Sequence, residues 1–225
     1  MKMASSKALF PLFVGVVLLA IASAHAQTTL ISTGAVWKYL DDGSDQGTAW
    51  SALGFNDSTW NSGPAELGFG DGGEATTNTS GFITYYYRRA FNVADTSSIT
   101  NFRARIKRDD GAVVYLNGVE VFRDNMPTGI VTSATLAATT AADDGQSFWP
   151  HSFAPTGLVN GNNVLAVEIH QSGLASSDIS FDLELVANPL PYISIATPTN
   201  GQTIASATVT VTGSAVPGGP SVNLV

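Results

Sequence analysis

Residues 109–122 read Asp109-Asp110-Gly111-Ala112-Val113-Val114-Tyr115-Leu116-Asn117-Gly118-Val119-Glu120-Val121-Phe122. Two runs of alternating apolar residues meet in this segment at Asn117-Gly118. An Asn-Gly pair between such runs is the strongest short-range sequence sign of a β-hairpin. The segment therefore predicts an antiparallel sheet.

A second segment, residues 177–185, alternates just as strictly. Its apolar positions are Ile179, Phe181, Leu183 and Leu185, and its polar positions are Asp178, Ser180, Asp182 and Glu184. A strand with one apolar face needs a second sheet to cover that face. We therefore expect an all-β fold, an antiparallel β-sandwich. The expected strands are residues 35–40, 85–93, 101–107, 112–116, 119–123, 146–153, 163–171 and 179–186. The expected core residues are Ile106, Val114, Leu116, Leu165, Val167, Ile169, Phe181 and Leu183.

The first 26 residues have the features of a secretory signal peptide. Lys2 and Lys7 precede an apolar run from Ala8 to about residue 22. Ala24 and Ala26 are the small residues that a signal peptidase recognises before its cleavage site. The alternative, a membrane anchor, is disfavoured because the run is shorter than the roughly 20 residues that a spanning helix needs. We expect cleavage before Gln27, secretion to the periplasm or the extracellular space, and no membrane association afterwards.

Composition excludes several functional classes. The net charge is −8 and becomes more negative when Lys2 and Lys7 are removed, which argues against a nucleic-acid partner. The absence of Cys excludes a lipid-anchored lipoprotein and a thiolate nucleophile. After the expected signal peptide only His151 and His170 remain, too few for a dinuclear metallohydrolase site. No Gly-x-Ser-x-Gly elbow of a serine hydrolase occurs. We therefore expect no enzyme here, and any catalytic domain would lie beyond Val225.

The chain divides into four parts. After the signal peptide, residues 27–187 form the expected sandwich, and residues 188–191, which read Asn-Pro-Leu-Pro, are an expected linker. Residues 192–225 contain only two or three strands' worth of sequence, too few for an immunoglobulin-like sandwich. This tail resembles the start of a truncated bacterial Ig-like domain, so we expect further domains to be covalently linked downstream.

Residues 30–187 resemble a known family of domains. The motifs that carry the resemblance are Trp37-Lys38-Tyr39-Leu40, Phe55-Asn56-Asp57-Ser58-Thr59-Trp60, Leu67-Gly68-Phe69-Gly70, Tyr87-Arg88-Arg89-Ala90-Phe91, the hairpin at 109–118, Asn125-Met126-Pro127, His170-Gln171 and Ser176-Ser177-Asp178. They are similar to the N-terminal jelly-roll, galactose-binding-like domain of secreted bacterial multidomain proteins, found beside metallophosphoesterase, lamin-tail, CotH or Ig-like domains. The resemblance implies an accessory module without chemistry of its own. Asn56 and Phe69 depart from the usual Asp and Tyr, which weakens any ligand role for these two positions.

The expected ligand site is formed by His170, Gln171, Ser177 and Asp178. His170 and Gln171 end a strand and lead into a Ser-rich loop, and their side chains offer the donors and acceptors that sugar hydroxyls need. The alternative is that the His170 ring holds the following loop. For the four Trp residues the alternatives are likewise sugar stacking or a place in the core.

Other charged groups also allow two interpretations. Asp109 and Asp110 could form an acid–base pair, but adjacent strand residues face opposite sides, so we favour a turn at Asp110 and a pairing of Asp109 with Arg108 or a backbone N–H. The row Arg103, Arg105 and Lys107 could bind an acidic glycan or pair with Asp182, Glu184 and Glu168. The acidic loops at 41–45 and 71–74 could hold Ca²⁺, and the resemblance leaves open one structural calcium ion without naming its ligands.

The sequence leaves two functions open. The first is a secreted, non-catalytic binding module for carbohydrate or a cell-surface glycan. The second is a purely structural spacer of a secreted metallophosphoesterase or cell-surface protein. Exposure of an aromatic side chain beside polar loop residues would favour the first, and burial of every aromatic would favour the second.

Overall fold

The hairpin predicted at Asn117-Gly118 joins strands β8 (Gly111–Leu116) and β9 (Val119–Asp124), which pair antiparallel. Asn117 and Gly118 have φ angles of 51° and 90°, as the two central residues of a type I′ turn require. The Asn117 side chain also accepts a hydrogen bond of 2.8 Å from the N–H of Val164, so the turn is fixed to the neighbouring strand.

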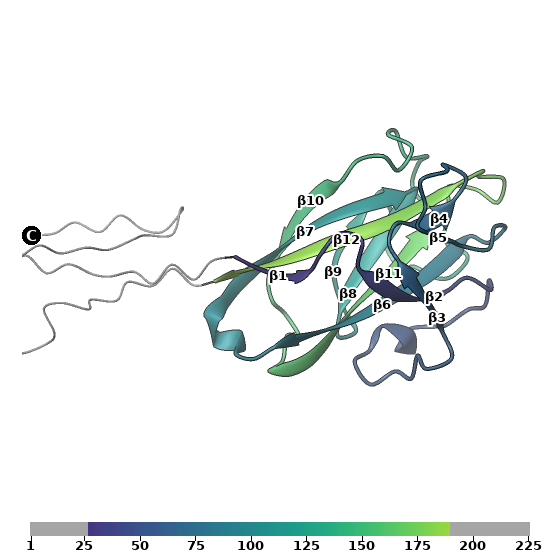
Figure 1. Cartoon of the computed structure of the whole chain (residues 1–225). Helices are drawn as coiled ribbons and strands as arrows, with labels where there is room; N and C mark the ends of the chain where they lie inside the picture. Colours follow the sequence, from purple (N-terminus) through teal and green to yellow (C-terminus); the bar gives the residue numbers. More distant parts are fainter. Residues whose placement is uncertain (1–26, 190–225) are drawn as a thin grey trace, which may run out of the picture. The chain divides into compact units, whose positions relative to one another are not determined.

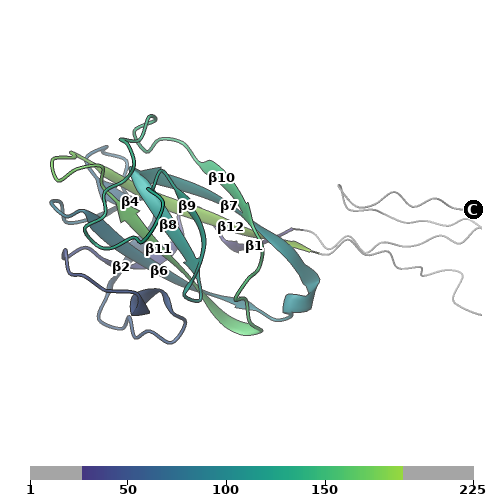
Figure 2. The same ribbon diagram turned by 180° about the vertical axis from the view of Figure 1, so that it is seen from behind.

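The computed structural model describes residues 27–189 and shows two six-stranded sheets packed face to face (Figure 1). The first sheet contains β10 (Trp149–Phe153), β7 (Ile99–Asp109), β12 (Ile179–Pro189), β4 (Leu67–Phe69) and β5 (Thr76–Thr77) in this order, and β1 (Thr28–Ile31) also pairs with β12. The second sheet contains β3 (Asn61–Pro64), β2 (Val36–Leu40), β6 (Thr84–Val93), β11 (Gly161–His170), β8 and β9, seen from behind in Figure 2. Two short 3₁₀ helices are Ala49–Ser51 and Thr96–Ser98. The all-β sandwich is confirmed.

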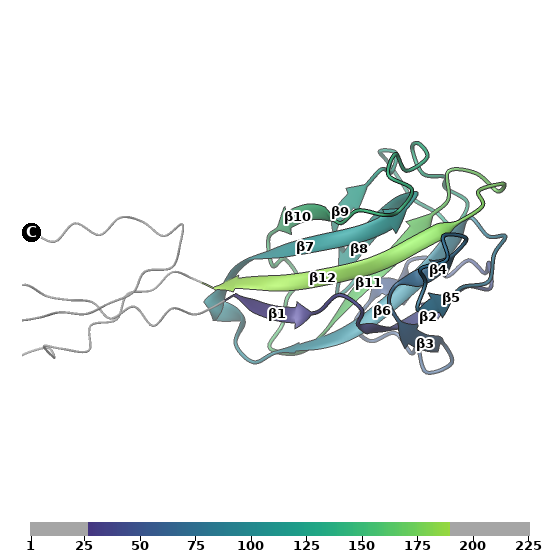
Figure 3. The same cartoon turned by 45° about the horizontal axis from the view of Figure 1, so that its top comes forward.

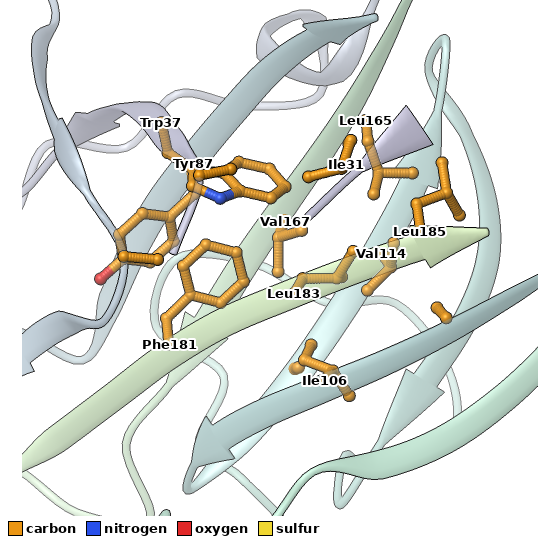
Figure 4. Packing of buried hydrophobic residues seen from close by; sticks show 14 of the residues in the cluster. Ile31, Trp37, Tyr87, Ile106, Val114, Leu165, Val167, Phe181, Leu183 and Leu185 are labelled. Carbon is orange, nitrogen blue, oxygen red and sulfur yellow. The ribbon is translucent and has the colours of Figure 1, made fainter. Parts of the chain in front are cut away.

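The core between the sheets is the one that the alternation predicts. All eight expected core residues are fully buried, and Figure 4 shows several of them meeting from both sheets. Trp37 lies edge-on against Phe181 with ring centroids 4.9 Å apart, and Tyr87 stacks on the same ring at 4.3 Å. This packing gives the described part of the chain one continuous apolar core without a disulfide.

A second apolar cluster lies on the outer face of the second sheet. The long loop after β2 places Trp50 and Trp60 against Tyr86 of β6, with Trp50 and Tyr86 ring centroids 4.8 Å apart. Arg88, itself buried, fixes this loop through hydrogen bonds to the carbonyl of Trp50 and to Asp57, 2.8 Å away. The loop is therefore ordered and packed by its own aromatic residues.

Strand bounds differ from the expected ones where side-chain alternation is absent. The sequence did not predict β1, β3, β4 or β5, which are two to four residues long. Strand β10 begins at Trp149 rather than at residue 146. The N–H of Ser147 instead donates a hydrogen bond of 2.9 Å to the carboxylate of Asp143, which closes a turn before the strand. Strand β12 runs to Pro189, two residues into the expected linker, and the proline lies beyond a register shift at the strand end.

The structure does not describe the two terminal segments of the chain. The expected signal peptide (1–26) and the expected Ig-like segment (192–225) lie outside the described residues. Within residues 27–189, no helix has the length and apolar character to cross a bilayer.

Candidate functional site

Three loops and one corner of the chain meet at the end of the sandwich where β7 ends and β12 begins (Figure 3). The loops are residues 70–75, 125–148 and 171–178, and the corner is 109–110, where the chain passes from the first sheet to the second. We call this set the loop rim. Strands β1 and β12 pair near Thr28 and Ala187 at the opposite end, so the rim lies far from both ends of the described part.

His170 lies beneath the rim and has no solvent exposure. Its Nδ1 atom is 2.7 Å from the carbonyl oxygen of Thr135 and 3.0 Å from Oγ1 of Thr84. A carbonyl can only accept, so Nδ1 donates, and the ring joins the 125–148 loop to strands β6 and β11. The structure thus matches the alternative in which His170 holds a loop. A ligand that approaches from solvent does not reach this ring.

Gln171 is also buried, with 2% of its surface exposed, and it closes the last loop of the rim. Its Nε2 donates to the carbonyl oxygen of Asp178 at 2.9 Å, which fixes both ends of residues 171–178. Ser177 is exposed and Asp178 is half-buried, with Ser177 Oγ 3.2 Å from Asp178 Oδ1. The structure therefore brings the four expected site residues together, but only Ser177 and Asp178 reach the surface.

Three carboxylates converge on the rim from its three loops. Asp71, Asp144 and Asp178 each place one side-chain oxygen within 4.8 Å of the others. Burial, followed by the negative charges of Asp71 and Asp144, raises the pKa of Asp178. The sequence suggested Asp71 as a Ca²⁺ ligand and Asp178 as part of the carbohydrate site, but it did not single out Asp144. The acids at 41–45 lie elsewhere, where Asp42 and Asp45 accept hydrogen bonds that close local turns.

The corner at 109–110 corrects one expectation. Asp109 does not pair with Arg108, which binds Asp124 at 2.9 Å, and Asp109 Oδ1 has no hydrogen-bond partner among the described residues. Burial, followed by a hydrogen bond and repulsion from Asp110, raises the pKa of Asp109 to about 8. The two side chains interact because Asp110 lies between strands, where strict alternation of faces does not apply.

Asp110 anchors two of the rim loops to the corner. It is fully buried and accepts hydrogen bonds from the N–H of Ala141 at 2.7 Å and of Ser172 at 2.6 Å. Burial alone would raise the pKa of Asp110, but hydrogen bonds from these two N–H groups and from the side chains of Ser172 and Asp109 outweigh it, and the pKa is lowered. The following Gly111 must be glycine, since a Cβ there would lie 2.6 Å from Met126 Sδ and 2.8 Å from a backbone carbonyl.

Trp149 is the one tryptophan of the four that is exposed. Trp37, Trp50 and Trp60 are buried, whereas 40% of the Trp149 surface faces solvent. Its indole N–H donates to Asp143 at 3.2 Å, and the guanidinium carbon of Arg108 lies 5.7 Å from its ring centroid. Trp149 follows directly after the rim loop that carries Asp144.

The cationic row on β7 is mostly neutralised by neighbouring acids. Arg105 pairs with Glu184 at 2.7 Å, as the sequence predicted, and Lys107 pairs with Glu66 at 2.6 Å. The prediction for Glu168 is wrong, because Glu168 belongs to β11 in the other sheet and accepts from Tyr115 there. Asp182 makes no ion pair among the described residues and instead accepts the N–H of Gly34. Glu66 was missed because it lies between two strands without a recognisable pattern.

Among known proteins, only solved structures are similar to this chain. No protein-family model matches the chain, and no curated protein matches its sequence. A β-glucuronidase of Bacteroides uniformis is 19% identical, with a TM-score of 0.47 over 73% of this chain and 18% of that one. A β-glucuronidase of an uncultured Clostridium sp. is 18% identical, with a TM-score of 0.48 over 80% of this chain and 32% of that one. A β-glucuronidase of Ruminococcus gnavus is 14% identical, with a TM-score of 0.48 over 74% of this chain and 29% of that one. The chain spans less than a third of the length of each of these three enzymes, and the fold assignment rests on the strand pairing itself.

Proposed function

We propose that this chain is a non-catalytic accessory module that binds carbohydrate at the loop rim, with Trp149 as the stacking surface. The observation that supports this most strongly is the 40% exposure of Trp149, in contrast to the burial of Trp37, Trp50 and Trp60. The exposed part of the indole offers an apolar aromatic surface to a partner. The apolar C–H face of a sugar ring is a partner of suitable size and chemistry.

Polar groups on the rim loops support a sugar over a purely apolar ligand. Gln146 and Ser147 are exposed in the same loop, directly before Phe148 and Trp149. Ser177 and Asp178 are the members of the expected ligand site that reach the surface of the rim. Hydroxyl, amide and carboxylate groups can replace the water that a sugar hydroxyl loses on binding. His170 and Gln171 then act by holding the loops beneath the ligand.

The burial of the groups that the sequence offered for catalysis supports binding without turnover. Asp109 and Asp110 are buried, so neither presents a carboxyl group to a bound sugar, and His170 is enclosed. His151 is bound to Asp124 at 2.9 Å. A glycosidase needs two carboxyl groups that flank an accessible bond.

We also propose that the module is secreted and is part of a larger protein. The support is the lysine-flanked apolar run and the small residues before Gln27, together with the tail that resembles an Ig-like domain. Mass spectrometry of the exported protein tests the first point, with a mature N-terminus at Gln27 as the expected result. An intact Met1 on the exported protein would contradict it.

A glycan array probed with the full chain, followed by affinity measurements on each hit, tests the binding proposal. Trp149→Ala should weaken binding about tenfold, and Trp149→Phe should retain most of it. Val119→Ala, which removes an apolar side chain of similar exposure outside the rim, should leave binding unchanged. Absence of any hit would favour the spacer function. Hydrolysis of a bound glycan would contradict the non-catalytic part of the proposal.

A further inference from the structure

We propose that one proton, held between His170 and Glu168, fixes the 125–148 loop to the second sheet, and that loss of this proton at higher pH loosens the loop. The proposal is independent of carbohydrate binding. Both residues belong to β11 and alternate with its core residues, so both side chains project from the outer face of the second sheet. The loop covers them there, since the carbonyl oxygen of Thr135 lies 2.7 Å from Nδ1 of His170.

The Nδ1 atom of His170 carries a hydrogen in this arrangement whatever the charge of the ring. The hydroxyl of Thr84 donates its single hydrogen to the carbonyl of Ser133 at 2.8 Å, so it can only accept from Nδ1, 3.0 Å away. The carbonyl of Thr135 can only accept as well. A neutral imidazole has one N–H group, and a neutral His170 therefore has a lone pair and no hydrogen on Nε2.

The Nε2 atom faces a carboxylate oxygen instead of a donor. It lies 3.5 Å from Oε2 of Glu168 and has no hydrogen-bond partner among residues 27–189. The side chain of His170 has no exposed surface, that of Glu168 has 6%, and the gap between the two atoms is too narrow for a water molecule. Two lone pairs that face each other away from water are unfavourable. One proton between Nε2 and Oε2 replaces this repulsion by a charge-assisted hydrogen bond.

The other titratable and charged groups around the pair have partners or protons of their own. Tyr115 of β8 donates to Oε1 of Glu168 at 2.7 Å, and burial, followed by the charge of Glu168, raises the pKa of Tyr115. Tyr86 lies opposite Glu168 on β6, and burial raises the pKa of Tyr86 to about 12. Arg123 of β9 is bound to Glu120 at 2.7 Å. The proton is therefore taken up and released by His170 and Glu168 themselves.

The buried carboxylate of Asp110 acts on a later part of the same loop. Asp110 precedes Gly111, which lies opposite His170 in the pairing of β8 with β11. Its two oxygens accept the N–H groups of Ala141 and Ser172. This contact needs no proton on the carboxylate, so the proton-dependent contact is the one at residues 133–137.

The proton controls how firmly the ring holds the loop. With the proton present, the positively charged ring donates from Nδ1 to the Thr135 carbonyl, and the charge strengthens this hydrogen bond. After its loss, Nε2 and Oε2 repel each other, and the His170 ring turns away from Glu168 and out of line with the Thr135 carbonyl. The loop contact is therefore strongest at low pH and weakens as the pH rises through the loss of the proton.

Amide hydrogen exchange and the ring ¹⁵N resonances of the full chain, compared at about pH 5.5 and 8.5, test the proposal. We expect protection factors at residues 133–137, corrected for the intrinsic exchange rate, to fall about tenfold at the higher pH, while those in β7 and β12 stay equal. The Nε2 resonance of His170 should move to the position of an unprotonated nitrogen, and Nδ1 should remain protonated. Equal protection at both pH values, or an Nε2 resonance that does not move, would overturn the proposal.

The variant Glu168→Gln separates the shared proton from the other contacts of the loop. An amide at this position can donate to Nε2 of a neutral ring while its oxygen accepts the Tyr115 hydroxyl, so protection at residues 133–137 should be equal at both pH values. The control His151→Gln removes the other histidine of the described residues and should keep the pH response of the original chain. A response that persists in Glu168→Gln, or that disappears in His151→Gln, would contradict a proton shared by His170 and Glu168.

Discussion

The backbone N–H of Ser172 donates a hydrogen bond of 2.6 Å to Oδ2 of Asp110, and so connects the corner between the two sheets to the loop that ends at Asp178. The other oxygen of Asp110 accepts the N–H of Ala141, three residues before Asp144. One buried carboxylate thus positions two of the three loops that form the rim.

Asp110→Ala should destabilise the chain by about 2–5 kcal/mol, because two N–H groups would lose their acceptor in a buried place. Chemical denaturation monitored by tryptophan fluorescence measures this change. Asp45→Ala, which removes a carboxylate from an exposed turn, should change stability by less than about 0.5 kcal/mol. Equal effects of the two substitutions would show that Asp110 does not hold the rim.

Leu183→Ala should lower the free energy of unfolding by about 2–5 kcal/mol, since Leu183 is fully buried between the sheets. The matched control is Leu174→Ala, because 72% of the Leu174 surface is exposed. An unchanged melting temperature for Leu183→Ala would show that Leu183 is not part of the core.

The fold follows from sequence where one face of a strand is apolar and the other polar. Strands β7 and β12 alternate clearly, and the predicted core residues of β7, β8, β11 and β12 are all buried. Strand β3 reads Asn-Ser-Gly-Pro and forms only because β2 lies beside it, so nothing local predicts it.

The candidate site is predicted less well because it depends on contacts between distant loops. The sequence identifies His170 and Gln171 as polar residues at a strand end, but their burial depends on residues 125–148 folding over them. Asp144 joins Asp71 and Asp178 only through the fold, since the three lie on separate loops. The exposure of Trp149 likewise follows from its place on an edge strand.

His170→Ala should loosen the 125–148 loop while leaving the sheets intact. The substitution removes the hydrogen bond to the Thr135 carbonyl and the contact with Thr84. Amide hydrogen exchange should therefore accelerate around residues 133–137 far more than in β7 or β12. Uniform acceleration throughout the chain, or none, would contradict a local anchoring role.

Acid stability should depend on Asp124. A hydrogen bond from His151, followed by the charge of Arg108, lowers the pKa of Asp124 below its usual range. This carboxylate therefore stabilises the fold above its unfolded pKa of about 3.9 and loses that contribution as the pH falls through its lower folded value. Asp124→Asn should flatten the loss of stability below about pH 4. An identical acid profile for the variant would exclude this contribution.

The indole N–H resonances of the four tryptophans provide the most direct test of a carbohydrate-binding rim. In a titration of the full chain with a glycan identified on the array, we expect the Trp149 resonance to shift with glycan concentration and to saturate. The resonances of the buried Trp37, Trp50 and Trp60 should stay in place. Saturable binding that leaves the Trp149 resonance unmoved would contradict a binding site at Trp149, because the glycan would then bind elsewhere.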